Sequence, residues 1–163
     1  MDLSDALGVF VLQLRADGRS PYTIRSYERH LGSLLDWLAK HGRSAALDEI
    51  TPQVLAEFLV SDDVRASGRG GLRSTSTVNA VRTSLRVVFG WLHDAGHTRI
   101  NPARLIRRAI CSPPPPKGLS EDQLDQLRSV LANATGVAAA RDRAMVALML
   151  GSGLRIGSTV DLD

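Results

Sequence analysis

Apolar residues recur along most of the chain at the three- and four-residue spacing of an α-helix, and no stretch alternates apolar and polar residues as a half-buried strand does. One predicted helix is carried by the apolar positions within 7–14 and stops near 17–18. A second begins at Ser20-Pro21, where serine suits the N-cap and proline the first helical position, and ends at Gly42. The pattern therefore predicts an all-α protein.

The second and third predicted helices are amphipathic. In the second, Arg25 and Arg29 lie opposite an arc of apolar side chains, namely Ile24, Tyr27, Leu31, Leu34, Leu35 and Leu38. The third follows Thr51-Pro52 and is expected to bury Val54, Leu55, Phe58 and Leu59. The loop 67–73 is basic and rich in glycine, which predicts mobility. It follows no strand and lacks a Gly-Lys-Ser/Thr ending, so a nucleotide P-loop is not predicted.

A fourth helix, predicted over 75–95, has two distinct faces. Its apolar arc is about 80° wide and holds Val78, Val81, Leu85, Val88 and Leu92. A second arc, roughly 110° away, presents Thr75, Asn79, Arg82 and Arg86. Guanidinium groups match phosphates or the guanine edge, and Asn and Thr reach phosphates or adenine, so this row suits the reading of a nucleic-acid duplex. The alternative is an ordinary solvent-facing surface.

Four consecutive prolines at 113–116 predict a semi-rigid linker, for which docking of an SH3-type partner is the alternative. Beyond it Ser120 suits the N-cap of a helix, and 141–150 forms another that is apolar nearly all round. Such a helix is normally buried, and about 50 residues supply too little surface to cover it. We therefore expect one domain at 1–111, a linker at 112–118 and an incomplete second unit at 119–163.

Net charge becomes informative only when it is divided along the chain. The formal net charge of the whole chain is +3, yet residues 65–108 carry nine arginines and a single acid, Asp94. The flanking segments are acidic, and the central segment alone carries +8. A basic segment of this size is typical of a phosphate-binding surface, which indicates duplex DNA as a partner.

Other chemistry is sparse. Cys111 is the single cysteine, so it forms no internal disulfide and is expected to be an inert thiol in the linker. His93 and His97 stand four residues apart without further ligands, so neither a metal nor a cofactor is predicted. No run of about 18 apolar residues and no basic signal peptide is present, which predicts a cytoplasmic protein without a membrane association. A small-molecule substrate is not expected either.

The chain resembles the tyrosine recombinase, or phage integrase, family. Arg141-Asp142-Arg143-Ala144 followed by Gly151-Ser152-Gly153-Leu154-Arg155-Ile156 is similar to the family's arginine box, an R-D-x-A helix leading into T-G-L-R-[IV]-S-E-L. The helices at 20–40 and 74–95, Asn101-Pro102 and Leu119-Ser120 resemble further family features in the same order. The resemblance implies a SAM-like core-binding bundle of four to five helices, then a linker and the first helices of a truncated catalytic domain.

By this resemblance, the family clamps duplex DNA between two domains and cuts one strand through a tyrosine, while a cage of cationic side chains stabilises the phosphate. Arg155 matches the first catalytic arginine, and a tetramer of recombinase protomers on DNA is the implied assembly. The DNA-contacting residues that we predict from the resemblance and the basic row are Arg19, Ser20, Tyr22, Thr23, Arg25, Arg69, Arg73, Ser74, Thr75, Asn79, Arg82, Arg86, Arg107 and Arg108.

Three departures from the family pattern restrict the expected activity. Ser158 stands where the family has glutamate, and no His-x-x-Arg occurs in the sequence. The only tyrosines are Tyr22 and Tyr27, far from any catalytic position. We therefore expect DNA binding without cleavage by this chain alone. The alternatives are a natural truncated regulator that binds recombination sites without catalysis, and a helical protein-interaction module.

Overall fold

The computed structural model describes residues 1–68, 70–112 and 118–162. It divides into two compact units, Met1–Ser112 and Pro113–Asp163, and each is described by itself. The predicted DNA-contacting residue Arg69 and the proline run at 113–116 lie outside the described residues. The described part is helical and contains no strand, so the predicted all-α class is confirmed.

Three helices of the first unit begin at the predicted positions, each with a capping hydroxyl side chain. The elements are α1 (Leu3–Ala16), α2 (Pro21–Lys40), a 3₁₀ turn η1 (Leu47–Glu49), α3 (Pro52–Val60), α4 (Asp62–Arg65) and α5 (Thr75–Asp94). The hydroxyls of Ser20, Thr51 and Ser74 each accept a hydrogen bond from the backbone N–H three residues on. Each cap satisfies an N–H group that the first helical turn leaves unpaired.

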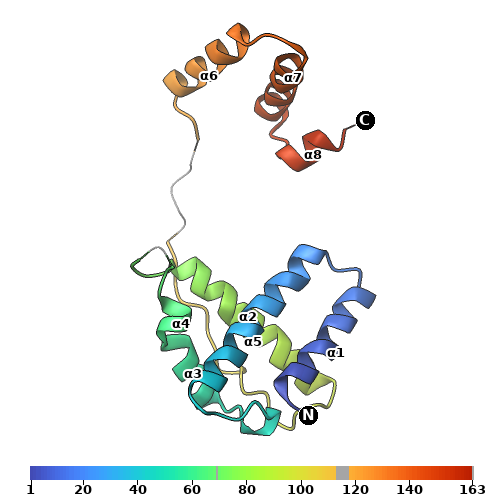
Figure 1. Cartoon of the computed structure of the whole chain (residues 1–163), viewed down its shortest axis with the longest axis vertical. Helices are drawn as coiled ribbons and strands as arrows, with labels where there is room; N and C mark the ends of the chain where they lie inside the picture. Colours follow the sequence, from blue (N-terminus) through green and yellow to red (C-terminus); the bar gives the residue numbers. More distant parts are fainter. Residues whose placement is uncertain (69, 113–117, 163) are drawn as a thin grey trace. The chain divides into compact units, whose positions relative to one another are not determined.

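The core of the first unit lies between α1, α2, α3 and α5, and α2 crosses α5 in Figure 1. The apolar arc predicted for α5 is fully buried, and the arc of α2 is buried or packed against the core. Phe10 lies between two aromatic neighbours, with ring centroids 5.3 Å from Tyr27 and 5.4 Å from Trp91. Because α2 and α5 bury one side against this core, their other sides form a common outer surface.

The second unit consists of α6 (Glu121–Asn133), α7 (Val137–Ser152) and α8 (Ile156–Val160). Ser120 caps α6 in a reciprocal pair with Gln123, as the serine suggests. The Arg143 guanidinium ties α7 to α6 by donating to the carbonyls of Leu131 at 3.2 Å and Ala134 at 3.0 Å. These are carbonyls at the end of α6 that its own helix leaves unpaired.

The apolar side of α7 is largely uncovered. Leu148 is 46% exposed and Leu150 47%, and Ala139 is the one apolar residue among the described part of this unit that is buried. A helix with this composition is stable when its apolar side is packed. Within the second unit, this side of α7 therefore remains exposed to solvent.

The structure adds elements that periodicity did not reveal. The turns η1, α4 and α8 hold three to five residues each, too few for a helical period to show. Helix α7 begins at Val137 instead of near 141, because alanines extend it toward its N-terminus without an apolar pattern. Within the described residues no helix is both long and apolar enough to cross a membrane.

Candidate nucleic-acid interface

Asn79 on α5 is buried, although the sequence predicts that it faces DNA. Only 1% of this residue is exposed, and its side chain holds the backbone of Ala109 from both sides. Its Nδ2 donates to the Ala109 carbonyl at 2.9 Å, and its Oδ1 accepts from the Ala109 N–H at 2.9 Å. The prediction that Asn79 presents a free hydrogen-bonding group is therefore wrong, because the segment after α5 folds back over it.

The same contact changes the interpretation of two neighbours. Arg82 is half-buried, and its Nη1 donates to the Asn79 Oδ1 at 2.9 Å. Asn79 Nδ2 also lies 3.1 Å from the Cys111 Sγ, so this exposed cysteine belongs to the first unit and contacts α5, whereas the sequence placed it in the linker. Arg82 is thus positioned as part of a folded network.

Arg86, by contrast, is exposed and borders a shallow pocket of about 430 Å³. The pocket brings Arg86 together with Arg104 from the segment after α5, and Thr83 and Asn101 add polar groups beside them. No carboxylate is among its lining residues. This part of α5 therefore offers two cations to an anionic partner.

A polar cleft lies where α2 crosses α5. It consists of two adjoining pockets that share Arg29 and His30, which we call the α2–α5 cleft. The larger, of about 540 Å³, is also lined by Tyr22, Thr23 and Arg108. The smaller, of about 330 Å³, is also lined by Ser33, Phe58, Val64, Arg73, Thr77 and Val81.

His30 lies at the junction of these two pockets. Its Nδ1 is 2.7 Å from the hydroxyl of Ser84, which is buried on α5, so this hydrogen bond joins the two crossing helices. Burial lowers the pKa of the His30 imidazole, and the positive charges of Arg29 and Arg73 lower it further. The neutral ring is therefore favoured because the cleft is already cationic.

The arginines of this surface have no acidic partners in the described structure. The ion pairs found there are Lys40–Asp63, Arg43–Glu57, Arg128–Asp125 and Arg141–Asp142. None of them involves residues 65–108, and no Asp or Glu lines the α2–α5 cleft. The excess positive charge of residues 65–108 therefore has no ion-pair partner in the described structure, and it is carried by α5 and by the segments before and after that helix.

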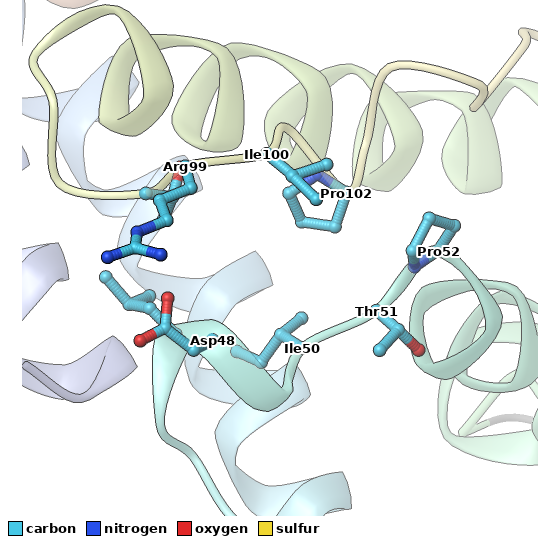
Figure 2. A pocket seen from close by; sticks show the side chains of 9 residues that line it. Asp48, Ile50, Thr51, Pro52, Arg99, Ile100 and Pro102 are labelled. Atoms are coloured by element: carbon cyan, nitrogen blue, oxygen red, sulfur yellow. The ribbon is translucent and has the colours of Figure 1, made fainter.

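A pocket elsewhere in the first unit has the opposite character. It has a volume of about 530 Å³, and its walls include Ile50, Pro52 and Pro102. Figure 2 shows Asp48 and Arg99 at the same end of this pocket. The carboxylate offsets the charge of the guanidinium there. This pocket therefore lacks the excess positive charge that a phosphate requires.

The structure brings some of the predicted DNA-contacting residues together and separates others. Tyr22, Thr23 and Arg108 meet in the α2–α5 cleft, and Arg73 borders the same cleft. Ser20 and Ser74 are exposed but their hydroxyls also cap helices, which gives them a structural role. The remaining predicted residues are exposed without lining either pocket of the cleft: Arg19, Arg25, Thr75 and Arg107.

Arg29 and His30, which line both pockets of the cleft, were absent from the predicted DNA-contacting residues. Arg29 repeats the position of Arg25 one turn on along the polar side of α2, so helical spacing alone could have included it. His30 could not have been found in this way, because its partner Ser84 is 54 residues distant in sequence.

Arg155 belongs to the second unit, between α7 and α8. Gly153 ends α7 with φ 69°, a left-handed conformation that glycine adopts without strain, and Arg155 then serves as the N-cap residue of α8. The Arg155 carbonyl accepts from both the N–H and the hydroxyl of Thr159, while the residue itself is exposed. The backbone is thus fixed and the guanidinium is accessible.

Fold and surface together define a class of protein: an all-helical bundle with a cationic face on two crossing helices, followed by a helical unit with an accessible arginine at a glycine turn. Residues 9–96 match the family described as "Phage integrase, N-terminal SAM-like domain". The chain therefore belongs to the tyrosine recombinase, or phage integrase, family.

Individual relatives agree with this assignment. The chain is 34% identical over 165 residues to the tyrosine recombinase XerC of Vibrio vulnificus, an alignment covering 99% of this chain and 48% of the relative. XerC of Serratia marcescens is 32% identical over 164 residues, with 99% and 50% covered. XerD of Ralstonia nicotianae is 33% identical over 146 residues, with 90% and 44% covered. The chain thus spans about half the length of these relatives.

A solved structure shares the fold. The integrase from mycobacterium phage Brujita superimposes with a TM-score of 0.53 and 22% sequence identity, covering 91% of this chain and 45% of that one.

Proposed function

We propose that this chain is the DNA-clamping part of a site-specific recombinase, in which the outer side of α2 and α5 binds duplex DNA. One observation carries the proposal: among the residues that the structure describes, the cations of this face have no carboxylate partner, although acids are plentiful in the flanking segments. Unpaired arginines are costly to hold together unless an anion neutralises them. The regularly spaced phosphates of a duplex supply such anions.

The proposed protein–DNA contacts are of two kinds, those to backbone phosphates and those to base edges. Arg29, Arg73 and Arg108 in the α2–α5 cleft suit phosphates, which fix the position of the protein on the duplex. Arg86 and Thr83 on the exposed side of α5 are free to approach base edges. Tyr22 near the start of α2 is 74% exposed and adds a hydroxyl and an aromatic ring to the same surface.

The second unit would add Arg155 to a catalytic cage on the scissile phosphate. Preorganised cations stabilise charge that develops on the non-bridging oxygens of the transition state. The other partners expected from the family, a nucleophilic tyrosine and a His-x-x-Arg motif, do not occur in this sequence. We therefore infer that these 163 residues bind DNA in the cytoplasm, together with other recombinase protomers, and do not cut it by themselves.

Binding is tested with a fluorescent duplex followed by anisotropy over a series of salt concentrations. The wild-type chain should bind at low salt, and its log affinity should fall linearly with log salt because phosphate contacts release counterions. The double variant Arg86→Ala/Arg104→Ala, in which both arginines are exposed and line one pocket, should bind less tightly. Its matched control, Arg15→Ala/Arg99→Ala, removes the same charge from the last turn of α1 and from the pocket that also holds Asp48, and should bind as the wild type does.

Absence of wild-type binding at low salt would overturn the proposal and favour a protein-interaction module. A nicked duplex that traps a covalent 3′-phosphotyrosyl intermediate tests the second half. We expect no covalent protein–DNA adduct, because Tyr22 and Tyr27 both lie on α2. An adduct would show that the inferred lack of cleavage is incorrect.

A further inference from the structure

We propose that the smaller pocket of the α2–α5 cleft is a dedicated site for one backbone phosphate of the duplex, with His30 as a ligand that takes up a proton when the phosphate binds. The inference rests on the proposed function, and it names a subsite and a residue that sequence reasoning did not. The pocket is lined by Arg29, His30 and Ser33 from α2, and by Arg73 and Thr77 at the start of α5.

The shape of the pocket suits a small anion. Its polar rim surrounds an apolar floor of Phe58, Val64 and Val81, which are at most 4% exposed. An apolar floor reduces the local dielectric response, so charges on the rim interact more strongly with a bound anion than they would on an open surface. Hydroxyls of Ser33 and Thr77 supply hydrogen-bond donors beside the two guanidinium groups.

The charges that face His30 have one sign. Arg29 comes from α2, Arg73 from the segment before α5, and Arg108 from the segment after α5 in the adjoining pocket. The elements α3 and α4 contribute only apolar residues to the lining. Asp63 on α4 is paired with Lys40 outside the pocket. A phosphate would therefore neutralise positive charge that nothing in the described lining neutralises.

His30 is already oriented for such a role. Because its Nδ1 is engaged by Ser84 at 2.7 Å, its Nε2 remains for a ligand. The imidazolium form donates from both ring nitrogens, so a phosphate at Nε2 favours that form. Burial is the largest cause of the lowered pKa of the free His30 ring, and Arg29 and Arg73 lower it further; the negative charge of a bound phosphate opposes the effect of the two arginines.

A measurable consequence follows from this opposing effect. Binding takes up a proton at any pH between the pKa of His30 in the free protein, which lies below 6.5, and its pKa in the complex. Duplex affinity should therefore rise as the pH falls through this interval, by at most about tenfold per pH unit for one proton.

The first experiment measures the salt dependence of duplex binding for Arg29→Ala/Arg73→Ala. Loss of one shared phosphate should lower the slope of log affinity against log salt by about 1 and weaken binding about tenfold at low salt. The control Arg15→Ala/Arg99→Ala should leave slope and affinity unchanged. Both arginines of the site are exposed, so the variant should fold normally, which tryptophan fluorescence verifies.

The second experiment follows the His30 ring by NMR in the wild-type chain, with and without duplex. Its pKa should rise in the complex, and in His30→Gln the pH dependence of affinity should flatten, since glutamine can still bond Ser84 but takes up no proton. Inorganic phosphate, titrated alone, should move the same resonances weakly and be displaced by duplex.

The outcomes separate the two proposals. If the wild-type chain binds DNA while Arg29→Ala/Arg73→Ala keeps its affinity and salt slope, the phosphate subsite is overturned and the proposed function stands. If the wild-type chain does not bind, the proposed function fails and the subsite with it. An unchanged His30 pKa in the complex, or a phosphate complex that duplex does not displace, also overturns the subsite.

Discussion

Replacement of Asn79 by alanine is expected to destabilise the first unit by breaking the clamp between α5 and Ala109. The two backbone hydrogen bonds of the Asn79 amide, each 2.9 Å long, contribute about 1 kcal/mol apiece. The bond from half-exposed Arg82 adds less than about 1 kcal/mol because solvent screens the charge. We therefore expect Asn79→Ala to lower the free energy of unfolding by about 2–3 kcal/mol.

Urea unfolding followed by tryptophan fluorescence measures this loss. Trp37 and Trp91 are the only two tryptophans and both lie in the first unit, so their emission reports on that unit alone. With a urea dependence of about 2 kcal/mol per molar, the midpoint should fall by about 1–1.5 M. The second unit does not contribute to the signal.

Thr83→Ala is the matched control on the same helix. Thr83 is exposed, and its hydroxyl donates to the Asn79 carbonyl within α5, so the substitution should change the free energy of unfolding by no more than about 0.5 kcal/mol. Equal urea midpoints for Asn79→Ala and the wild type would refute the clamp, and would return Asn79 to the set of groups available to DNA.

Three further outcomes are expected from the same unfolding assay. The pKa of His30 is lowered below 6.5 in the folded protein, so the unfolded state binds more protons as the pH falls through that value. The urea midpoint of the wild type should therefore be lower at about pH 5.5 than at about pH 8. An equal decrease in the midpoint of His30→Gln would show that His30 is not the cause. Ser74→Ala removes the hydroxyl that caps α5 at the Thr77 N–H and should cost about 1 kcal/mol, whereas an unchanged midpoint would show that this cap is dispensable. Leu85→Ala opens a cavity at a residue that is 0% exposed and should cost about 2–5 kcal/mol; a smaller loss would mean that the core between α2 and α5 collapses to fill it.

Much of the fold could be predicted from local patterns. The long helices α2 and α5 begin at the predicted positions because serine caps and apolar periodicity act within a few residues of each other. The short elements η1, α4 and α8 could not be predicted, since their conformation depends on the surrounding packing more than on their own composition.

The candidate site shows the same division more sharply. Helical spacing identified Arg82 and Arg86 as neighbours on α5, but it gave Asn79 the same exposed role, although the segment at 109–111 covers it. Arg86 faces solvent beside Arg104, while Arg82 is held in the network around Asn79. A helical wheel describes one isolated helix, so it cannot represent a chain segment that returns to pack on that helix.

The sequence by itself determined the helical class, the family, and the concentration of positive charge at 65–108, because these depend on residue type and local spacing. Only the tertiary structure decided which of those charges face one another. The crossing of α2 and α5 places His30 against Ser84 and between Arg29 and Arg73, residues drawn from separate parts of the chain. The physical reason is that burial and electrostatic interaction depend on distances in space, and those are established only when distant segments pack together.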